Sequence, residues 1–292
     1  MKRKTAFDRG VKVMSYKTLL VSLNEIERLD AVLGVAASLA GAQKSHVLGL
    51  YVIPAPAVYP AVGPYVVPEV FDGLTRYFEE QSKGARRKFE AVMKRHELSF
   101  QWLEVKALTS AISDTVSEMG RIADLVVVSE TNRDGRNGVE LDFVENIILG
   151  VGRPVLILPR SATAAFDPAI VLCGYNGSKE AARAVHDAIP LLKNAKDVRL
   201  LWVDAAKELE TGALPGAEMV ECLRRHGVKA SAESLPSNGL NPAEAIMAQA
   251  RETGAGVVVM GAYGHSRIRE FVLGGATRHA LSAMTMPLLV SH

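Results

Sequence analysis

Short apolar runs alternate with stretches of helical spacing along most of the chain. In the second half we expect strands over Ile170–Gly174, Val198–Val203, Lys229–Leu235, Gly256–Met260 and Pro287–Val290. Between these runs, apolar residues recur at helical spacing over Ser178–Leu192, Gly216–His226 and Pro242–Glu252. Continuous apolar runs such as GVVVM are typical of strands buried on both faces, so the pattern favours a parallel sheet with crossover helices.

The chain contains two similar units in tandem. YKTLLVSLNE at 16–25 resembles PAIVLCGYNGS at 168–178, ADLVVVSE at 123–130 resembles AGVVVMGA at 255–262, and RPVLILPR at 153–160 resembles MPLLVSH at 286–292. Three matches in the same order predict two domains, residues 15–160 and 168–292, joined by the linker Ser161–Pro168. The predicted fold class is α/β, with two doubly wound five-stranded parallel-sheet domains in tandem.

The first copy is about twenty residues longer than the second between its first and fourth strands. The excess lies around Pro54–Val70, whose prolines are predicted to forbid a regular helix or a central strand. A lid or interface loop and an exposed connector are both open interpretations.

Composition narrows the class of protein. A hydrophobic content of 48% and a charged content of 23% are typical of a folded globular chain. No apolar run approaches the ~18 residues of a membrane span, and the basic start lacks the apolar core of a signal peptide. The two cysteines, Cys173 and Cys222, have no metal-type spacing and predict a reducing, cytoplasmic location. A net charge of +2 with interspersed signs argues against nucleic acid as a partner.

A glycine-rich segment, GAYGHSRIREFVLGGATR, follows the fourth predicted strand of the second copy. Doubly wound sheets bind ligands at the carboxyl ends of their strands. We expect Gly261 and Gly264 to allow positive φ and to remove two β-carbons from the turn. Gly274 and Gly275 start the next helical pattern, where free N–H groups and the helix dipole favour a phosphate. Further donors nearby are His265, Ser266, Arg267, Arg269, Thr277, Arg278 and His279.

From about Tyr16 to His292 the chain resembles tandem universal stress proteins of the UspA type. Nucleotide-binding members carry G-x2-G-x9-G-(S/T), which falls here on Gly261, Gly264, Gly274 and then Gly275. The resemblance implies a Rossmann-like, adenine nucleotide alpha hydrolase-like fold and a bound adenine nucleotide, ATP or else ADP or AMP, with Mg accompanying ATP. Gly275 departs from the Ser or Thr of the family, so we expect binding to survive with a loss of ~1 kcal/mol.

The resemblance also places the nucleoside. Gly174, Tyr175 and Asn176 match the residues that hold it, with Asn176 in place of an Asp; an amide still accepts a hydrogen bond but carries no charge. A plain turn over NGS is the alternative. Val203 matches the backbone contact to adenine, and Pro242 matches a proline at the pocket mouth. The complete predicted site is Gly174, Tyr175, Asn176, Val203, Pro242, Met260, Gly261, Gly264, His265, Arg267, Gly274, Gly275, Ala276 and Thr277.

The first copy lacks the glycines. Ser129 matches Gly261, Asn132 matches Gly264, and the Gly274 position falls near Leu141. We therefore predict a degenerate domain that binds no nucleotide. Single-domain members of the family pair through their last strands, which implies an intrachain pseudo-dimer through 154–158 and 287–291, while a further homodimer is open.

No catalytic residue or metal ligand is assigned. The histidines have no metal spacing, no Walker lysine follows the glycines, and no base is evident beside Ser266 or Cys173. Asp204 has two interpretations, a residue near a phosphate-bound metal or a loop carboxylate. Three functions stay open: a stress-response module that binds an adenine nucleotide and acts through unknown protein partners, a low-turnover ATPase, and a scaffold with a vestigial pocket.

Overall fold

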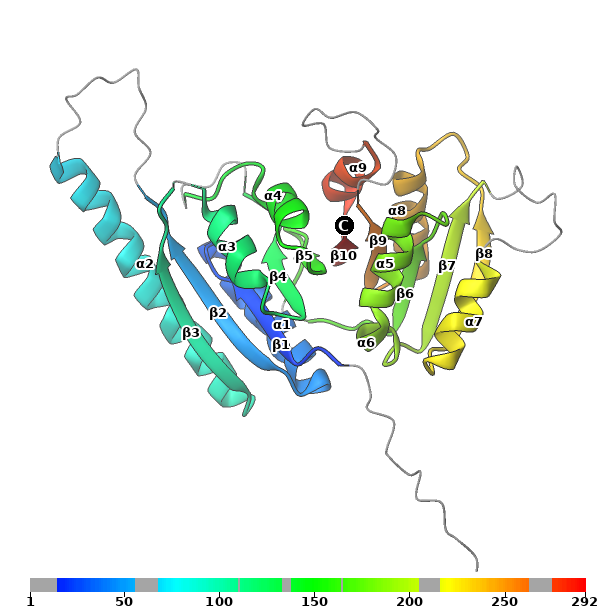
Figure 1. Ribbon diagram of the computed structural model, residues 1–292, viewed down its shortest axis with the longest axis horizontal. Coiled ribbons are helices and arrows are strands. Elements are labelled where there is room, and N and C mark those ends of the chain that lie inside the picture. Colours follow the sequence, from blue (N-terminus) through cyan, green and yellow to red (C-terminus); the bar gives the residue numbers. More distant parts are fainter. Residues whose placement is uncertain are drawn as a thin grey trace, which may run out of the picture.

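The computed structural model describes residues 15–55, 68–109, 111–132, 138–163, 165–204, 216–262 and 275–292. These residues build one ten-stranded sheet in the order β3-β2-β1-β4-β5-β10-β9-β6-β7-β8 (Figure 1). The strands are β1 (Thr18–Ser22), β2 (His46–Ile53), β3 (Ser99–Lys106), β4 (Leu125–Ser129), β5 (Val155–Leu158), β6 (Ile170–Gly174), β7 (Asp197–Val203), β8 (Ala230–Leu235), β9 (Val257–Gly261) and β10 (Leu288–Ser291).

The helices are η1 (Ile26–Arg28), α1 (Leu29–Gln43), α2 (Pro68–Arg95), α3 (Ile112–Gly120), α4 (Phe143–Gly150), α5 (Lys179–Asp187), α6 (Ile189–Leu192), α7 (Ala217–Arg225), α8 (Pro242–Thr253) and α9 (Gly275–Ala283). No helix in the described ranges is long and apolar enough to cross a bilayer.

Each half of the sheet has the same strand order. β1 to β5 lie in the order β3-β2-β1-β4-β5, and β6 to β10 repeat it as β8-β7-β6-β9-β10. All neighbouring strands within a half are parallel. The predicted α/β class and both doubly wound units are therefore confirmed, and every predicted strand of the second half ends within one residue of its observed limits.

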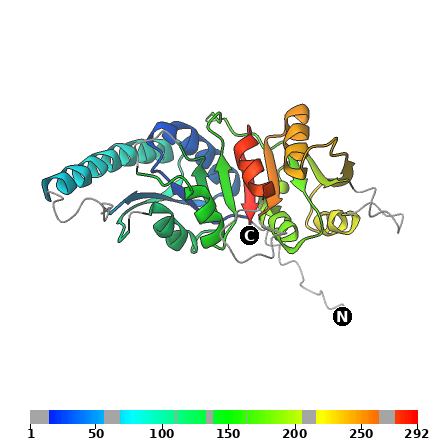
Figure 2. The ribbon, with the colours of Figure 1, turned by 90° about the horizontal axis from the view of Figure 1, so that it is seen from above.

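Helices cover both faces of the sheet (Figure 2). One core cluster packs α1, α2, α5, α6 and α7 against the sheet, and the other packs α3, α4, α8 and α9 against the opposite face. The central strands β4 and β9 are buried on both sides, as the continuous apolar runs predict. Each core cluster thus lies on one face of the shared sheet and contains residues of both halves.

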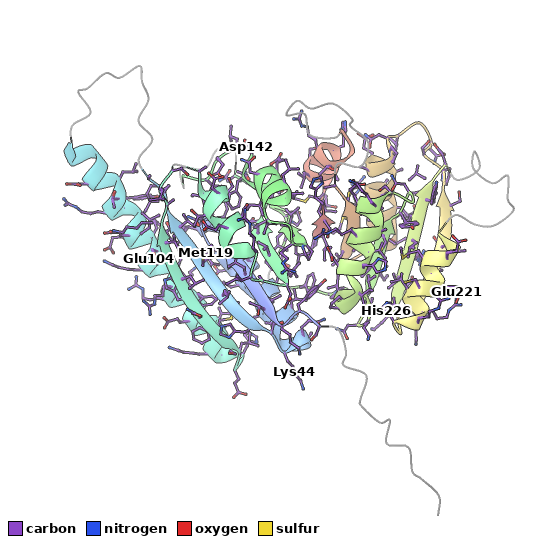
Figure 3. The ribbon with its side chains drawn as sticks, in the orientation of Figure 1. Lys44, Glu104, Met119, Asp142, Glu221 and His226 are labelled. Carbon is purple, nitrogen blue, oxygen red and sulfur yellow. The ribbon has the colours of Figure 1, made fainter. Side chains whose placement is uncertain are left out.

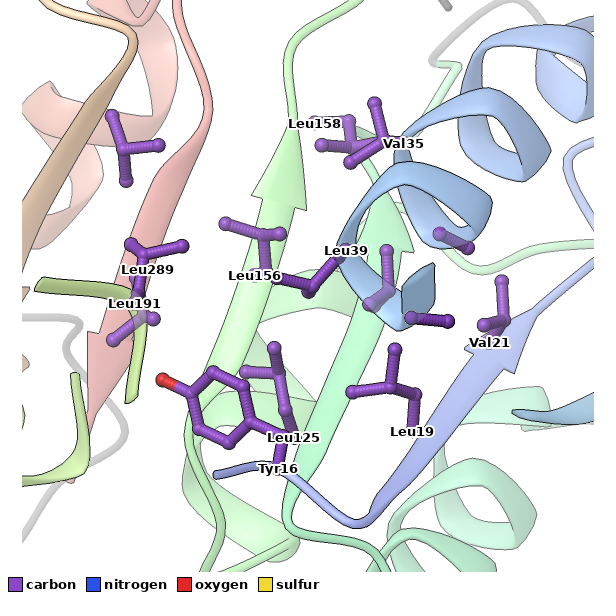
Figure 4. Packing of buried hydrophobic residues seen from close by; sticks show 14 of the residues in the cluster. Tyr16, Leu19, Val21, Val35, Leu39, Leu125, Leu156, Leu158, Leu191 and Leu289 are labelled. Atoms are coloured by element: carbon purple, nitrogen blue, oxygen red, sulfur yellow. The ribbon is translucent and has the colours of Figure 1, made fainter. Parts of the chain in front are cut away.

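The two halves join through their last strands. β5 and β10 pair antiparallel, with Leu156 opposite Leu289, which confirms the predicted pairing. Tyr16 also crosses the junction, because its hydroxyl donates to the Asp187 carbonyl oxygen at 2.8 Å. Figure 4 shows Tyr16 beside Leu156 and close to Leu191 and Leu289 of the second half. The junction is therefore both hydrogen-bonded and apolar.

Two proline effects differ from the predictions. The helix predicted over Ser178–Leu192 is divided at Ala188 into α5 and α6, because Pro190 has no N–H to continue the helical ladder. Conversely, the prolines of Pro54–Val70 were predicted to forbid a helix, yet α2 begins at Pro68. Proline is tolerated in a first helical turn, where its N–H would have no intrahelical acceptor. Residues 56–67 lie outside the described ranges.

Candidate functional site

The carboxyl ends of the strands of the second half bring several predicted site residues together. Gly174 ends β6 and lies opposite Met260 of the neighbouring strand β9. Val203 ends β7, Gly261 ends β9, and α8 begins at Pro242. The helix α9, whose first residues are Gly275, Ala276 and Thr277, follows the glycine-rich segment. Gly264, His265, Arg267 and Gly274, with Ser266 and Arg269, fall outside the described residues.

An aromatic pair forms one wall beside β6. The half-buried ring of Tyr175 meets Trp202 edge-to-face, with 6.0 Å between ring centroids. Gly177 has a left-handed φ of 72°, and a Cβ there would lie 3.2 Å from the Trp202 ring. This turn exposes Asn176, whose Oδ1 accepts from the Ser178 N–H at 3.2 Å. Trp202 was missed in the sequence, where its place directly before Val203 was the available signal.

The Tyr175 hydroxyl is held in its protonated form. Burial raises the pKa of this phenol first, and the charges of Glu218 and Cys222 raise it further. A protonated phenol is a hydrogen-bond donor at neutral pH. Tyr175 therefore contributes its ring to this wall, and its donor hydroxyl lies within reach of the charges of Glu218 and Cys222 on α7.

Gly261 is a glycine for a reason different from the predicted one. It ends a strand, and it is not among the residues with positive φ. A Cβ at Gly261 would lie 2.5 Å from the Ala181 nitrogen and 2.5 Å from the Glu180 carbonyl carbon. The first turn of α5 therefore packs directly on the strand end. The prediction that Gly261 provides positive φ is wrong, because helix packing already requires a missing side chain there.

The helices that start at this edge differ in how their first turns are satisfied. In α5 the Ser178 hydroxyl accepts from the Ala181 N–H. In α8, Asn241 and Glu244 form a reciprocal capping box. Both ends therefore use their own side chains. The first turn of α9 contains no acidic residue, which leaves it the most favourable of the three for an anion.

A buried carboxylate reinforces the first turn of α5. Burial alone would raise the pKa of Glu180, but a hydrogen bond from its own backbone N–H and the nearby Lys179 ammonium lower it below its usual range. An ionised carboxylate in a first helical turn is stabilised by the helix dipole. Since Glu180 lies against Gly261, this helix end repels a second anion.

Two other candidates have structural partners. Asp204 has a left-handed φ of 55°, and its Oδ1 accepts from the Ser237 N–H at 2.9 Å. This contact favours the loop-carboxylate interpretation. His279 is exposed on α9, and its Nδ1 lies 3.5 Å from Glu244 Oε1 on α8. No cluster of three or more His, Cys, Asp or Glu in the described part of the chain is arranged to hold a metal.

The matching edge of the first half is filled by its own side chains. Asn24, which matches Asn176, is buried and donates from Nδ2 to the Val52 carbonyl oxygen at 2.7 Å. Its Oδ1 accepts from the Val52 N–H at 3.0 Å. Val52 lies in β2 two residues beyond the partner of Ser22, the last residue of β1. Val203 lies in β7 two residues beyond the partner of Gly174, the last residue of β6, so the two valines match. The Asn24 amide thus pairs with the backbone whose counterpart is the predicted adenine contact.

The place in the first half that matches Gly264 is also occupied by side chains of that half. Glu25 accepts from the Asn132 N–H at 3.2 Å, and Glu27 accepts from the Asn132 side chain at 3.2 Å. Arg160 donates to the Asn132 Oδ1. This network links the loop after β4 to η1, at the place where Asn132 matches Gly264.

The matched helices α4 and α9 have opposite charges at their N-terminal ends. Counting back from Pro154 and Pro287, which precede the last strands, matches Asp142 with Gly275 and Glu145 with Arg278. Figure 3 shows Asp142 at the start of α4. Two carboxylates in the first half therefore stand where the second half has a glycine and an arginine.

The comparisons with known proteins agree with the fold. The sequence model of the universal stress protein family matches residues 169–292. No curated protein sequence matches the chain. A universal stress protein from Archaeoglobus fulgidus is 16% identical, covers 94% of this chain and 97% of its own, and superposes with a TM-score of 0.67. A functionally unknown protein from Pseudomonas aeruginosa PAO1 is 15% identical, with coverages of 94% and 92% and a TM-score of 0.60.

A universal stress protein solved in complex with cAMP is 18% identical over 42% of this chain and 96% of its own, with a TM-score of 0.34. The long matches share the fold across both halves, whereas the family match is confined to the second half.

Proposed function

We propose that the second domain, whose residues 169–292 match the sequence model of the universal stress protein family, binds an adenine nucleotide, with ATP as the first candidate. In this proposal the first domain comprises residues 15–160 and the second domain comprises residues 168–292. The nucleotide-bound chain acts as a stress-response regulatory module, and the first domain serves as a fixed, non-binding partner.

The contrast between α9 and α4 carries this proposal. The first turn of α9 contains Gly275 and Arg278, and the matched positions are Asp142, directly before α4, and Glu145 in its first turn. A phosphate is attracted by a helix N-terminus and by an arginine, and it is repelled by two carboxylates. The same fold thus has one helix end that suits an anion and one that excludes it.

The remaining residues have roles that fit a nucleoside. Asn176 is exposed at the end of β6 and offers an amide to a ribose hydroxyl. The Val203 backbone is the adenine contact, and Tyr175 with Trp202 forms an apolar wall. Met260 and Pro242 line the edge between β9 and α8.

Calorimetric titration of the full chain with ATP, ADP and AMP tests the proposal. Gly275→Asp recreates the α4 pattern and is expected to weaken ATP binding at least about tenfold, since one added charge repulsion of ~1.4 kcal/mol has that effect. Gly275→Ser restores the hydroxyl of the family motif and is expected to tighten binding about fivefold, equivalent to ~1 kcal/mol. Asp142→Gly, the matched change in the first half, should leave the affinity unchanged.

Gly275→Asp is preferred to a larger residue at Gly261, because a Cβ at Gly261 meets the α5 backbone. An acidic residue in a first helical turn stabilises the helix, so the melting temperature of Gly275→Asp should not be lower than that of the wild type. Equal ATP affinity in the wild type and in Gly275→Asp refutes the assignment. Phosphate release that disappears in Gly275→Asp would instead identify a low-turnover ATPase.

A further inference from the structure

A thiol and an imidazole meet between α5 and α7 of the second half. Cys222 Sγ lies 3.8 Å from His186 Nε2. The other ring nitrogen of His186, Nδ1, lies 2.8 Å from the Ala182 carbonyl oxygen. A carbonyl oxygen only accepts hydrogen bonds, so Nδ1 carries the hydrogen and Nε2 presents its lone pair to the thiol. The Cys222 thiol, the His186 imidazole and the Ala182 carbonyl are thus arranged as a nucleophile, a base and a group that orients the base.

The chain contains an internal reference thiol. Cys173 lies in β6 and is fully buried, and burial raises the pKa of its thiol to about 12. Cys222 is half-buried and His186 is exposed, so a small reagent reaches this pair from solvent. Reactivity of a cysteine depends on access and on a partner for its proton. Cys222 has both, whereas Cys173 has neither.

We propose that Cys222 is a site of reversible modification by low-molecular-weight disulfides, with His186 as the base. The Cys222 sulfur attacks one sulfur of the disulfide as its proton passes to His186 Nε2. The new S–S bond forms as the old one breaks, and the departing thiolate takes the proton from His186. The Cys222 sulfur is oxidised, the departing sulfur is reduced, and a second thiol reverses the exchange.

The position of Cys222 links this modification to the proposed nucleotide site. The helix α7 carries Cys222 and begins next to Gly216, where a Cβ would lie 3.4 Å from the Tyr175 ring. Met219 of the same helix and Tyr175 both pack against one core cluster. A bulky group on Cys222 therefore displaces α7 from α5 and disturbs the Tyr175 wall. This link rests on the proposed function, whereas the thiol exchange does not.

The exchange is tested on the full chain with oxidised glutathione, followed by mass spectrometry of the intact protein and of its peptides. We expect one adduct on Cys222 and none on Cys173, and loss of the adduct in Cys222→Ser. His186→Gln should slow the exchange about tenfold at neutral pH. His226→Gln is the matched control, because His226 directly follows α7 (Figure 3), whereas the imidazole that meets the thiol among the described residues is that of His186. The exchange rate of His226→Gln should equal that of the wild type.

An unchanged rate in His186→Gln, or modification of Cys173 before Cys222, overturns the proposal. Calorimetry of the adduct then tests the link to the nucleotide. We expect the adduct to bind ATP several-fold more weakly than the unmodified chain, and equal affinity overturns the link. A chain that forms the adduct as expected but binds no adenine nucleotide in either state refutes the proposed function and leaves the modification site standing.

Discussion

The two matched asparagines predict very different losses of stability. Asn24 is 1% exposed and uses its amide to pair with both the N–H and the carbonyl of Val52, which is itself fully buried. Asn176 is exposed on the turn before α5, where its Oδ1 accepts from the Ser178 N–H. Alanine at position 24 leaves two buried backbone groups without partners. Alanine at position 176 leaves none buried.

The magnitude follows from the two lost bonds. Each unsatisfied buried group costs about 1–3 kcal/mol, so Asn24→Ala should lower the free energy of unfolding by about 3 kcal/mol. Asn176→Ala should lower it by about 0.5 kcal/mol, as expected for an exposed position. For a chain of this size the larger loss corresponds to a fall in melting temperature of about 6 °C.

Urea unfolding followed by tryptophan fluorescence measures this difference. The chain has two tryptophans, Trp102 in the first half and Trp202 in the second. Replacing either one by Phe leaves a reporter for the other half. The Asn24→Ala loss should be largest with the Trp102 reporter. Equal losses of stability in the two asparagine variants would refute the view that the Asn24 side chain fills the edge of the first half that matches the candidate site.

Two further predictions concern the start of α5. Gly261→Ala should lower the free energy of unfolding by about 2 kcal/mol through overpacking against Ala181, whereas Gly73→Ala in α2, where nothing lies within 4 Å, should raise it by about 0.5 kcal/mol; equal urea midpoints would contradict this. The lowered pKa of Glu180 predicts a contribution to stability that is complete above the unfolded-state pKa of about 4.3 and is lost as pH falls through the folded-state value. Glu180→Gln should remove that part of the acid dependence in urea titrations between about pH 5 and pH 2, and an unchanged pH profile would exclude it.

Much of the fold was predictable because strand burial determines the sequence pattern. The runs at 125–129 and 257–261 are apolar on both faces, and each became a central strand. The division of the helix at Ala188 was harder to predict from the sequence, because Pro190 is compatible with either a kinked helix or the first turn of a new helix. The start of α2 at Pro68 was missed for the same reason. Proline ends one helical pattern and starts another equally well.

The strand ends that carry several predicted site residues lie where the sequence placed them, but the structural reason for one glycine, Gly261, differs from the predicted one. Gly261 was expected to serve a turn, and the neighbour that requires it, the first turn of α5, is distant in sequence from the glycine motif. Asn24 and Asn176 are the same residue at matched positions, yet one is buried and the other exposed. The next residue decides between them, because Gly177 adopts a φ of 72° while Glu25 has a φ of −80°. Whether the asparagine is buried or exposed therefore depends on the backbone conformation of the following residue and not on the asparagine itself.

The antiparallel contact between β5 and β10 has a consequence for how the two halves can change over time. All residues of both strands are buried and most are apolar, so either half alone would expose a strand prone to aggregation. Each half acts as a permanent cover for the other. A loss of ligand binding in the first half would therefore cost no solubility, whereas loss of its last strand would. Selection can therefore relax on the loops of the first half while it still constrains β5, the strand that pairs with β10.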